Sequence, residues 1–147
     1  MNRLLVLIHL AAVIVWVGGM FFAHFCLRPV AAVQLQPPQR LPLLTSVLGR
    51  FLPIAGLALV LLWVSGLTRF AQVGALVPGN WYAMAGLGMT MTVVYGLVAF
   101  RYHPRMVSAL GIQDWSAAGK AMNTIRVLVQ TNLTLGFVTV VTAVVGW

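Results

Sequence analysis

The segment LLVLIHLAAVIVWVGGMFFAHFCL, residues 4–27, decides the fold because it carries no formally charged side chain. A helix needs about 20 apolar residues to cross the ~30 Å hydrocarbon core of a bilayer. Three further apolar stretches of comparable length follow, at residues 51–68, 81–100 and 127–147. The sequence therefore predicts an all-α integral membrane four-helix bundle, in which residues 1–147 form a single transmembrane domain.

Basic residues gather in two of the three connections between these stretches. Of the 9 Lys and Arg residues, only Arg3 and Arg69 lie away from the first and third connections and their edges. Connections that stay in the cytoplasm carry an excess of Lys and Arg. The charge distribution therefore predicts that the first and third connections are cytoplasmic and that both termini are outside, an N-out/C-out topology.

The composition excludes several classes of protein. Hydrophobic residues make up 61% of the chain and charged residues 7%, which is too apolar for a soluble domain. The net charge of +8 follows the membrane topology and does not indicate a nucleic-acid binder, which would carry its basic residues on an exposed polar surface. Asp114 is the only acidic residue, so no carboxylate pair, Ser-His-Asp triad or carboxylate-ligated metal site is available.

The connections predict where the helices begin. Residues 29–50 are rich in proline and glutamine, so this connection is not expected to continue a helix through the bilayer. Pro53 is then expected in the first turn of the second helix, where a missing N–H costs little. Asp114 is the expected N-cap of a surface helix that continues into the fourth membrane helix.

His9 and Met84 are the main candidates for a site within the bilayer. His9 lies about five residues, or roughly 7 Å, inside the outer end of the first helix. An ionisable side chain at such a depth is a functional-site hypothesis by default. Met84 is expected at a similar depth in the third helix. Imidazole and thioether form a known axial pair for haem iron, and they also suit Cu(I). The alternative is that His9 bonds to an Asn or Thr of another helix and that Met84 fills the core.

The helix faces that contain His9 and Met84 are open to two interpretations. In the first helix, Trp16 and Gly19 share the face of His9, and in the third helix Gly88 shares the face of Met84. Small residues on such a face indicate either close packing of helices or room for a flat ligand.

Other polar or sulfur-bearing residues are less specific candidates. His24 and His103 are expected near the inner interface, where a histidine meets headgroups and water at little cost. Met91 is a further thioether on the face of the third helix. Gln130 and Asn132 are expected to be buried polar groups of the fourth helix.

Residues 9–20, followed by Arg28 and Pro29, resemble the opening helix of the copper-resistance protein D (CopD) family. The similarity extends through nearly the whole chain as a short four-helix form, at Trp63, Gly66, residues 81–88, Asp114, Trp115, Arg126, Asn132, Leu133 and Gly136. The pattern is also distantly similar to the HemJ-type protoporphyrinogen oxidases, whose first-helix histidine falls on His9. A lysine of their third helix falls on Met84, so protoporphyrinogen oxidation is not expected here.

The residues and the resemblance together lead to the expectation of a haem b between the first and third helices. His9 and Met84 would be its axial ligands, with Trp16, Gly19 and Gly88 beside the macrocycle. Arg3 or Arg69 would pair with the haem propionates. Such a protein would transfer electrons between quinol, or a periplasmic redox partner, and its haem. Whether it is a haem-dependent membrane oxidoreductase is left open.

Two other kinds of protein fit the same sequence. A copper-handling membrane protein would use His9, Met84, Met91 and Met20 as a Cu(I) relay, with His24 and His103 as less favoured ligands. A structural subunit would carry no cofactor. In each case the expected location is the bacterial inner membrane, with both termini periplasmic. The expected partners are lipid and, in a homo-oligomer, further copies of the chain.

Overall fold

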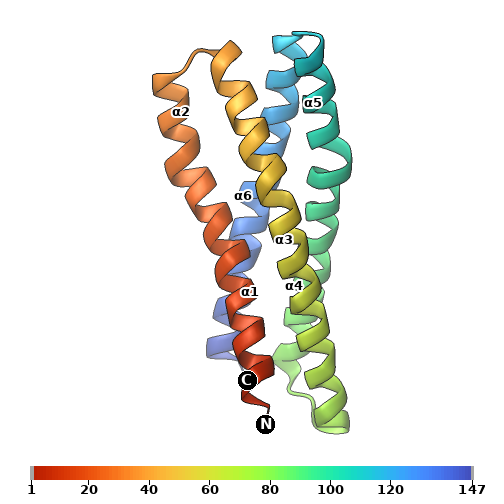
Figure 1. Ribbon diagram of the computed structural model, residues 1–147. Helices are drawn as coiled ribbons and strands as arrows, with labels where there is room; N and C mark the ends of the chain where they lie inside the picture. The colour runs from red at the N-terminus through yellow and green to blue at the C-terminus, as the bar shows by residue number, and fades with distance from the viewer. Residues whose placement is uncertain (1, 147) are drawn as a thin grey trace.

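Four long apolar helices make up nearly all of the computed structural model, which describes residues 2–146. They span Arg3–Gln34, Pro37–Leu76, Gly79–Gly111 and Trp115–Val145, and each is long and apolar enough to cross a membrane. No β-strand occurs within residues 2–146. The predicted all-α four-helix membrane architecture is confirmed, and the chain is a multi-pass membrane protein. Its two ends lie together at one end of the bundle (Figure 1).

The first and third of these helices are each divided by a π-helical turn. The first consists of α1 (Arg3–Phe22), the turn Ala23–Leu27 and α2 (Arg28–Gln34). The third consists of α4 (Gly79–Leu97), the turn Val98–Tyr102 and α5 (His103–Gly111). Each turn comes just before a proline, Pro29 or Pro104. Because proline lacks an N–H and its ring clashes with the carbonyl four residues earlier, the hydrogen bonding shifts by one residue at these places.

The first two long helices extend further into residues 29–50 than their predicted bounds, 4–27 and 51–68. Only Leu35 and Gln36 separate α2 from the second long helix, α3 (Pro37–Val73), which a short 3₁₀ turn Gly74–Leu76 extends. Pro37 and Pro38 occupy the first turn of α3, where proline is tolerated. Pro53, expected in a first turn, lies inside α3. Tertiary packing accounts for the extra helix, since the apolar side of its first turns is buried in the bundle.

Asp114 caps α6 (Trp115–Val145), as predicted. Its Oδ1 accepts a hydrogen bond of 3.0 Å from the backbone N–H of Ala117. This bond satisfies one of the free donors of the first turn. A single unbroken helix then runs from the cap through the whole bundle.

The helices pack in a defined order around the bundle. The main partner of α1 is α3, the main partner of α4 is α6, and α1 and α6 also touch. At the end opposite the termini, α5 packs against both α3 and α6. It follows that α1 and α4 occupy diagonal positions, so a group that joins them must pass beside α3 or α6.

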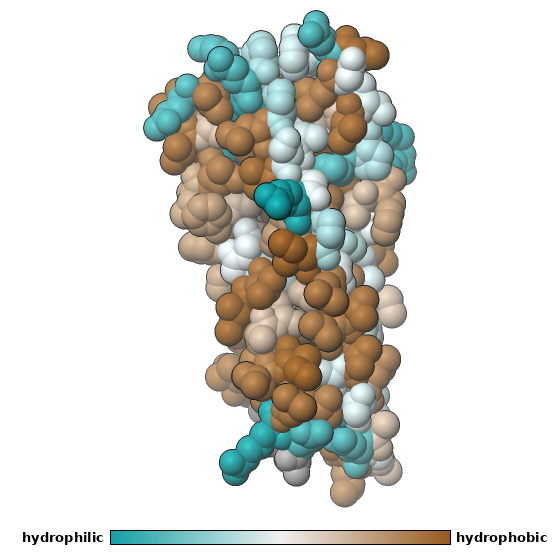
Figure 2. Space-filling model, viewed as in Figure 1, coloured by the Kyte–Doolittle hydropathy of each residue, from teal (hydrophilic) through white to brown (hydrophobic). Residues whose placement is uncertain are grey.

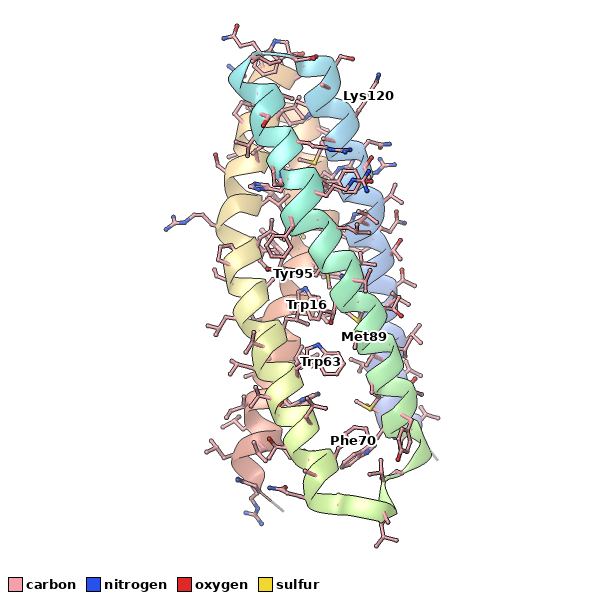
Figure 3. The ribbon with its side chains drawn as sticks, turned by 90° about the vertical axis from the view of Figure 1, so that its right-hand side faces the viewer. Trp16, Trp63, Phe70, Met89, Tyr95 and Lys120 are labelled. Atoms are coloured by element: carbon pink, nitrogen blue, oxygen red, sulfur yellow. The ribbon has the colours of Figure 1, made fainter. Side chains whose placement is uncertain are left out.

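The core at the centre of the bundle is built around an aromatic pair. Trp16 of α1 is 3% exposed and meets Tyr95 of α4 edge to face, with ring centroids 6.4 Å apart. The Tyr95 hydroxyl donates a 2.7 Å hydrogen bond to the carbonyl of Leu52 in α3. The three helices are thereby joined by one aromatic contact and one hydrogen bond (Figure 3).

The outer surface is apolar between two polar ends. Large aliphatic and aromatic side chains such as Ile14, Val33 and Phe100 are exposed along the helices. Figure 2 shows hydrophilic residues mostly towards the two ends, with a largely apolar belt between them that a hydrophilic residue interrupts near mid-height. This distribution matches a protein whose sides face lipid.

Candidate functional site

His9 bonds to the neighbouring helix through one ring nitrogen. Its Nδ1 lies 2.8 Å from Oγ of Ser65, a residue of α3 that is 1% exposed. The Ser65 hydroxyl in turn lies 2.6 Å from the carbonyl oxygen of Leu61. The imidazole is therefore anchored to α3 at a buried position. The hydrogen-bond partner of His9 is thus a serine and not the Asn or Thr that the alternative interpretation expected.

The hydrogen bonds assign the tautomer of His9. A hydroxyl has one proton, and the Ser65 proton is donated to the main chain of α3. We therefore assign the imidazole proton to Nδ1, which then donates it to Ser65 Oγ. Nε2 keeps its lone pair, and no hydrogen bond links it to another residue within 2–146. Histidines that bind a metal are commonly held in this way, with the second ring nitrogen donating to a fixed acceptor.

The His9 ring reaches α3 where that helix has a glycine between two aromatic residues. A Cβ added to Gly66 would lie 3.7 Å from His9 Cε1, so the ring edge faces this glycine. Trp63 and Phe70 precede and follow Gly66 by three and four residues, which places all three on one face of α3. Figure 3 shows Trp63 and Phe70 between α3 and α4.

Met84 lies on the face of α4 that is turned towards α3. Trp63 Nε1 donates a 3.0 Å hydrogen bond to Thr92 Oγ1, and the Phe70 and Trp81 rings lie 5.5 Å apart. These contacts join α3 to α4 on both sides of Met84. Met84 follows Trp81 by three residues, so it shares the face of α4 that meets α3. We call His9, Ser65 and Gly66 the His9 site.

One cation lies beside this site, towards the end that holds the termini. The Arg69 guanidinium stacks over the Trp81 ring, with 4.9 Å between its carbon and the ring centroid. It is close enough to His9 for its charge to act on the imidazole. A cleft of about 550 Å³ beside it is lined by residues such as Asn2, Arg69 and Trp81. An anionic group can be held there next to the His9 site.

The three other residues expected beside a macrocycle have packing roles in this structure. Trp16 belongs to the central core. A Cβ on Gly19 would collide with the Phe51 ring, so Gly19 allows α1 and α3 to approach each other. Gly88 faces Trp63, and a Cβ there would lie 3.9 Å from that ring. Of the three, Gly88 is the one on the α4 face that carries Met84.

The less favoured ligands lie away from the His9 site. His103 Nε2 donates a 3.1 Å hydrogen bond to the backbone carbonyl of Thr45, which ties α5 to α3. His24 lies in the first π-helical turn, edge to face with Phe25 at 4.9 Å. Met91 is 4% exposed in the central core, where the Thr139 hydroxyl is 3.9 Å from its sulfur.

Of the two amide side chains expected to be buried in the fourth helix, only one is buried. Asn132 is 3% exposed, and its Nδ2 donates a 3.1 Å hydrogen bond to the carbonyl of Met91. Gln130 is exposed, so the expectation of a second buried amide was wrong. A shift of two residues along a helix turns the side chain by about 200°, away from the core.

Sequence reasoning missed Ser65 as the partner of His9 and Gly66 as the residue beside its ring. A signal was present, because Ser65 and Gly66 form a pair of small residues directly after the bulky residues 59–64. Which face of α3 meets His9 depends on the register between helices, which one sequence does not specify.

Comparisons with known proteins leave the chain without an assigned family. No protein-family model matches it, and neither a curated protein nor a solved structure was found that matches it. Within residues 2–146, no three His, Cys, Asp or Glu side chains come together as a metal site. A metal at the His9 site would therefore need ligands other than a cluster of these side chains.

Proposed function

We propose that this protein is a membrane electron-transfer module that holds a haem b at the His9 site. The observation that carries the proposal is the hydrogen bond from His9 Nδ1 to Ser65, which fixes the ring and leaves Nε2 as a lone-pair donor. A porphyrin supplies four of the iron ligands, so one or two protein ligands suffice. This requirement agrees with a site that contains a single histidine.

Each of these residues would have a separate role in binding the haem. His9 would ligate the iron through Nε2, and Ser65 would keep the imidazole in the required tautomer. Met84 of α4 would supply a thioether ligand. Arg69 would pair with a propionate at the polar end of the site. When bound, the haem supplies reversible one-electron chemistry at iron.

The proposed setting follows the resemblance to the CopD family and the charge distribution. We place the protein in the bacterial inner membrane, where quinol or a periplasmic protein would be its redox partner. With both termini periplasmic, the His9 site lies in the outer half of the bilayer, close to a periplasmic partner.

Reporter fusions at the C-terminus test this orientation. Alkaline phosphatase fused after residue 147 should be active, because it folds in the periplasm, whereas a fluorescent protein that folds only in the cytoplasm should be dark. A fusion in the connection that contains Asp114 serves as the opposite control. The reverse pattern would move the His9 site to the cytoplasmic half and remove the periplasmic partner from the proposal.

Ser65→Ala should weaken haem binding about 10- to 100-fold, the usual cost of losing the group that orients a ligating histidine. Alanine removes the only side chain that accepts the His9 Nδ1–H bond, while the helix keeps its shape. Titration of the purified apoprotein with haemin measures the affinity. Ser46→Ala, an exposed position of the same helix, is the control and should bind as the unaltered protein does. Equal affinities in the two variants would mean that Ser65 does not orient a ligand.

Met84→His should retain haem and lower its reduction potential, since replacing thioether by imidazole favours ferric iron. Met84→Leu should leave haem with one protein ligand. It should preserve the fold, because a Met-to-Leu exchange usually costs less than about 1.5 kcal/mol. Redox titration followed by absorbance gives the potential. If neither variant alters potential or spectrum, the second ligand is not Met84.

A further inference from the structure

Three arginines lie in the half of the bundle opposite the termini. Arg28 begins α2, Arg40 lies in the first turn of α3, and Arg126 belongs to α6. Each is half-buried. The charge of Arg28 interacts with those of both Arg126 and Arg40. The helix α2 contacts α3, and the turn that precedes α2 contacts α6, so Arg28 lies within electrostatic range of the other two arginines. In a partly dehydrated place, such like charges repel more strongly than in water.

No carboxylate of the chain compensates this cluster. Asp114 is the only acidic residue, and its carboxylate caps α6 by accepting from Ala117. The Nε atom of Arg126 is buried and has no hydrogen-bond partner within residues 2–146. A buried donor without a partner is rare and calls for an explanation, of which a bound water or ion is one. The surroundings of Arg126 thus point to a negatively charged ligand.

Of the three arginines, Arg40 lines a cleft of about 560 Å³ between the first turns of α3 and α6. Its polar lining includes Arg40 and Lys120, and its apolar lining includes Leu41 and Trp115. Lys120 lies near the end opposite the termini in Figure 3. The cleft also reaches Asn123, which precedes Arg126 by three residues and so shares its side of α6.

We propose that Arg28, Arg40 and Arg126 bind the phosphate group of an anionic phospholipid, with the rest of the headgroup in the α3–α6 cleft. Guanidinium groups suit this role because their planar N–H forks match phosphate oxygens two at a time. Basic pockets between membrane helices are typical sites for anionic headgroups. Leu41 and Trp115 provide the apolar surface that a glycerol backbone and the first acyl carbons need. Inorganic phosphate is the other source of the same chemistry.

Native mass spectrometry of the detergent-purified full chain tests the proposal. The unaltered protein should retain added phosphatidylglycerol at least about tenfold better than phosphatidylcholine. Arg126→Gln and Arg40→Gln should each reduce phosphatidylglycerol binding on the order of tenfold, the factor that corresponds to one charge-assisted hydrogen bond. Arg50→Gln is the matched control. It removes the same charge from an exposed position of α3 and should leave binding unchanged.

Competition with inorganic phosphate separates the two sources. If phosphate displaces phosphatidylglycerol, and Arg126→Gln weakens phosphate binding too, the site accepts free phosphate as well as lipid. If phosphate has no effect, the ligand is the lipid. Equal retention of the two lipids by the unaltered protein would overturn the proposal, even if an arginine variant failed to fold. Equal losses in Arg40→Gln and Arg50→Gln would overturn it too, because the effect would then be one of net charge alone.

Discussion

Replacing His9 with alanine should abolish stable haem binding, with a loss of affinity of more than about 100-fold. The loss should exceed that of Ser65→Ala, because removing a ligand costs more than removing the group that orients it. Neither of the other two histidines can replace it, because His24 packs against Phe25 and His103 bonds to Thr45. Haemin titration and the absorbance of protein purified from cells that make haem both measure the effect.

Two controls separate ligation from folding in this variant. His103→Ala removes another histidine, and it should destabilise the junction of α5 and α3 without removing haem. Circular dichroism should show that His9→Ala keeps its helices, because the half-buried imidazole is a minor part of the packing between α1 and α3. Full haem occupancy in His9→Ala would make His9 a packing residue that merely bonds to Ser65.

Trp16→Ala should cause the largest loss of stability of any single change considered, about 3–5 kcal/mol. The indole is 3% exposed, belongs to the central core and contacts Tyr95 of the diagonal helix. Its removal leaves a cavity at the centre of the bundle, and the surrounding helices are too closely packed to close it. Denaturation in mixed micelles, followed by helicity, measures the change in the free energy of unfolding.

Ile14→Ala is the matched control for this variant. Ile14 lies on the same helix and is 70% exposed, on a surface that faces lipid. Lipid tails are as apolar as the side chain, so the loss should stay below about 1 kcal/mol. Similar losses in the two variants would contradict the position of Trp16 at the centre of the bundle.

The long apolar runs made the number of helices predictable, and Asp114 made the start of α6 predictable. Both signals are local, since a span of about 20 apolar residues and a capping carboxylate act within one helix. The start of α3 was not predictable in this way. Pro37, Pro38 and Pro42 indicate a loop by local rules, yet the helix forms because Leu41 and Leu44 are buried against other helices.

The candidate site was predictable in its residue types and less so in its partners. His9 stood out because an ionisable group within a span is costly. Its bond to Ser65, however, joins residues 56 positions apart and depends on the register of α1 against α3. Gly19 shows the opposite error. A glycine on the His9 face suggested room for a macrocycle, but the Phe51 ring of α3 fills that place.

The absorption spectrum of the purified, reduced protein tests the central claim most directly. If His9 holds a haem b, the protein should be red, with a Soret band and a reduced α-band, and one haem per chain should be extracted. A colourless protein that contains one copper per chain, or no metal at all, would contradict the account. The first of these outcomes would favour a Cu(I) site at His9, and the second would leave the bundle without a redox centre.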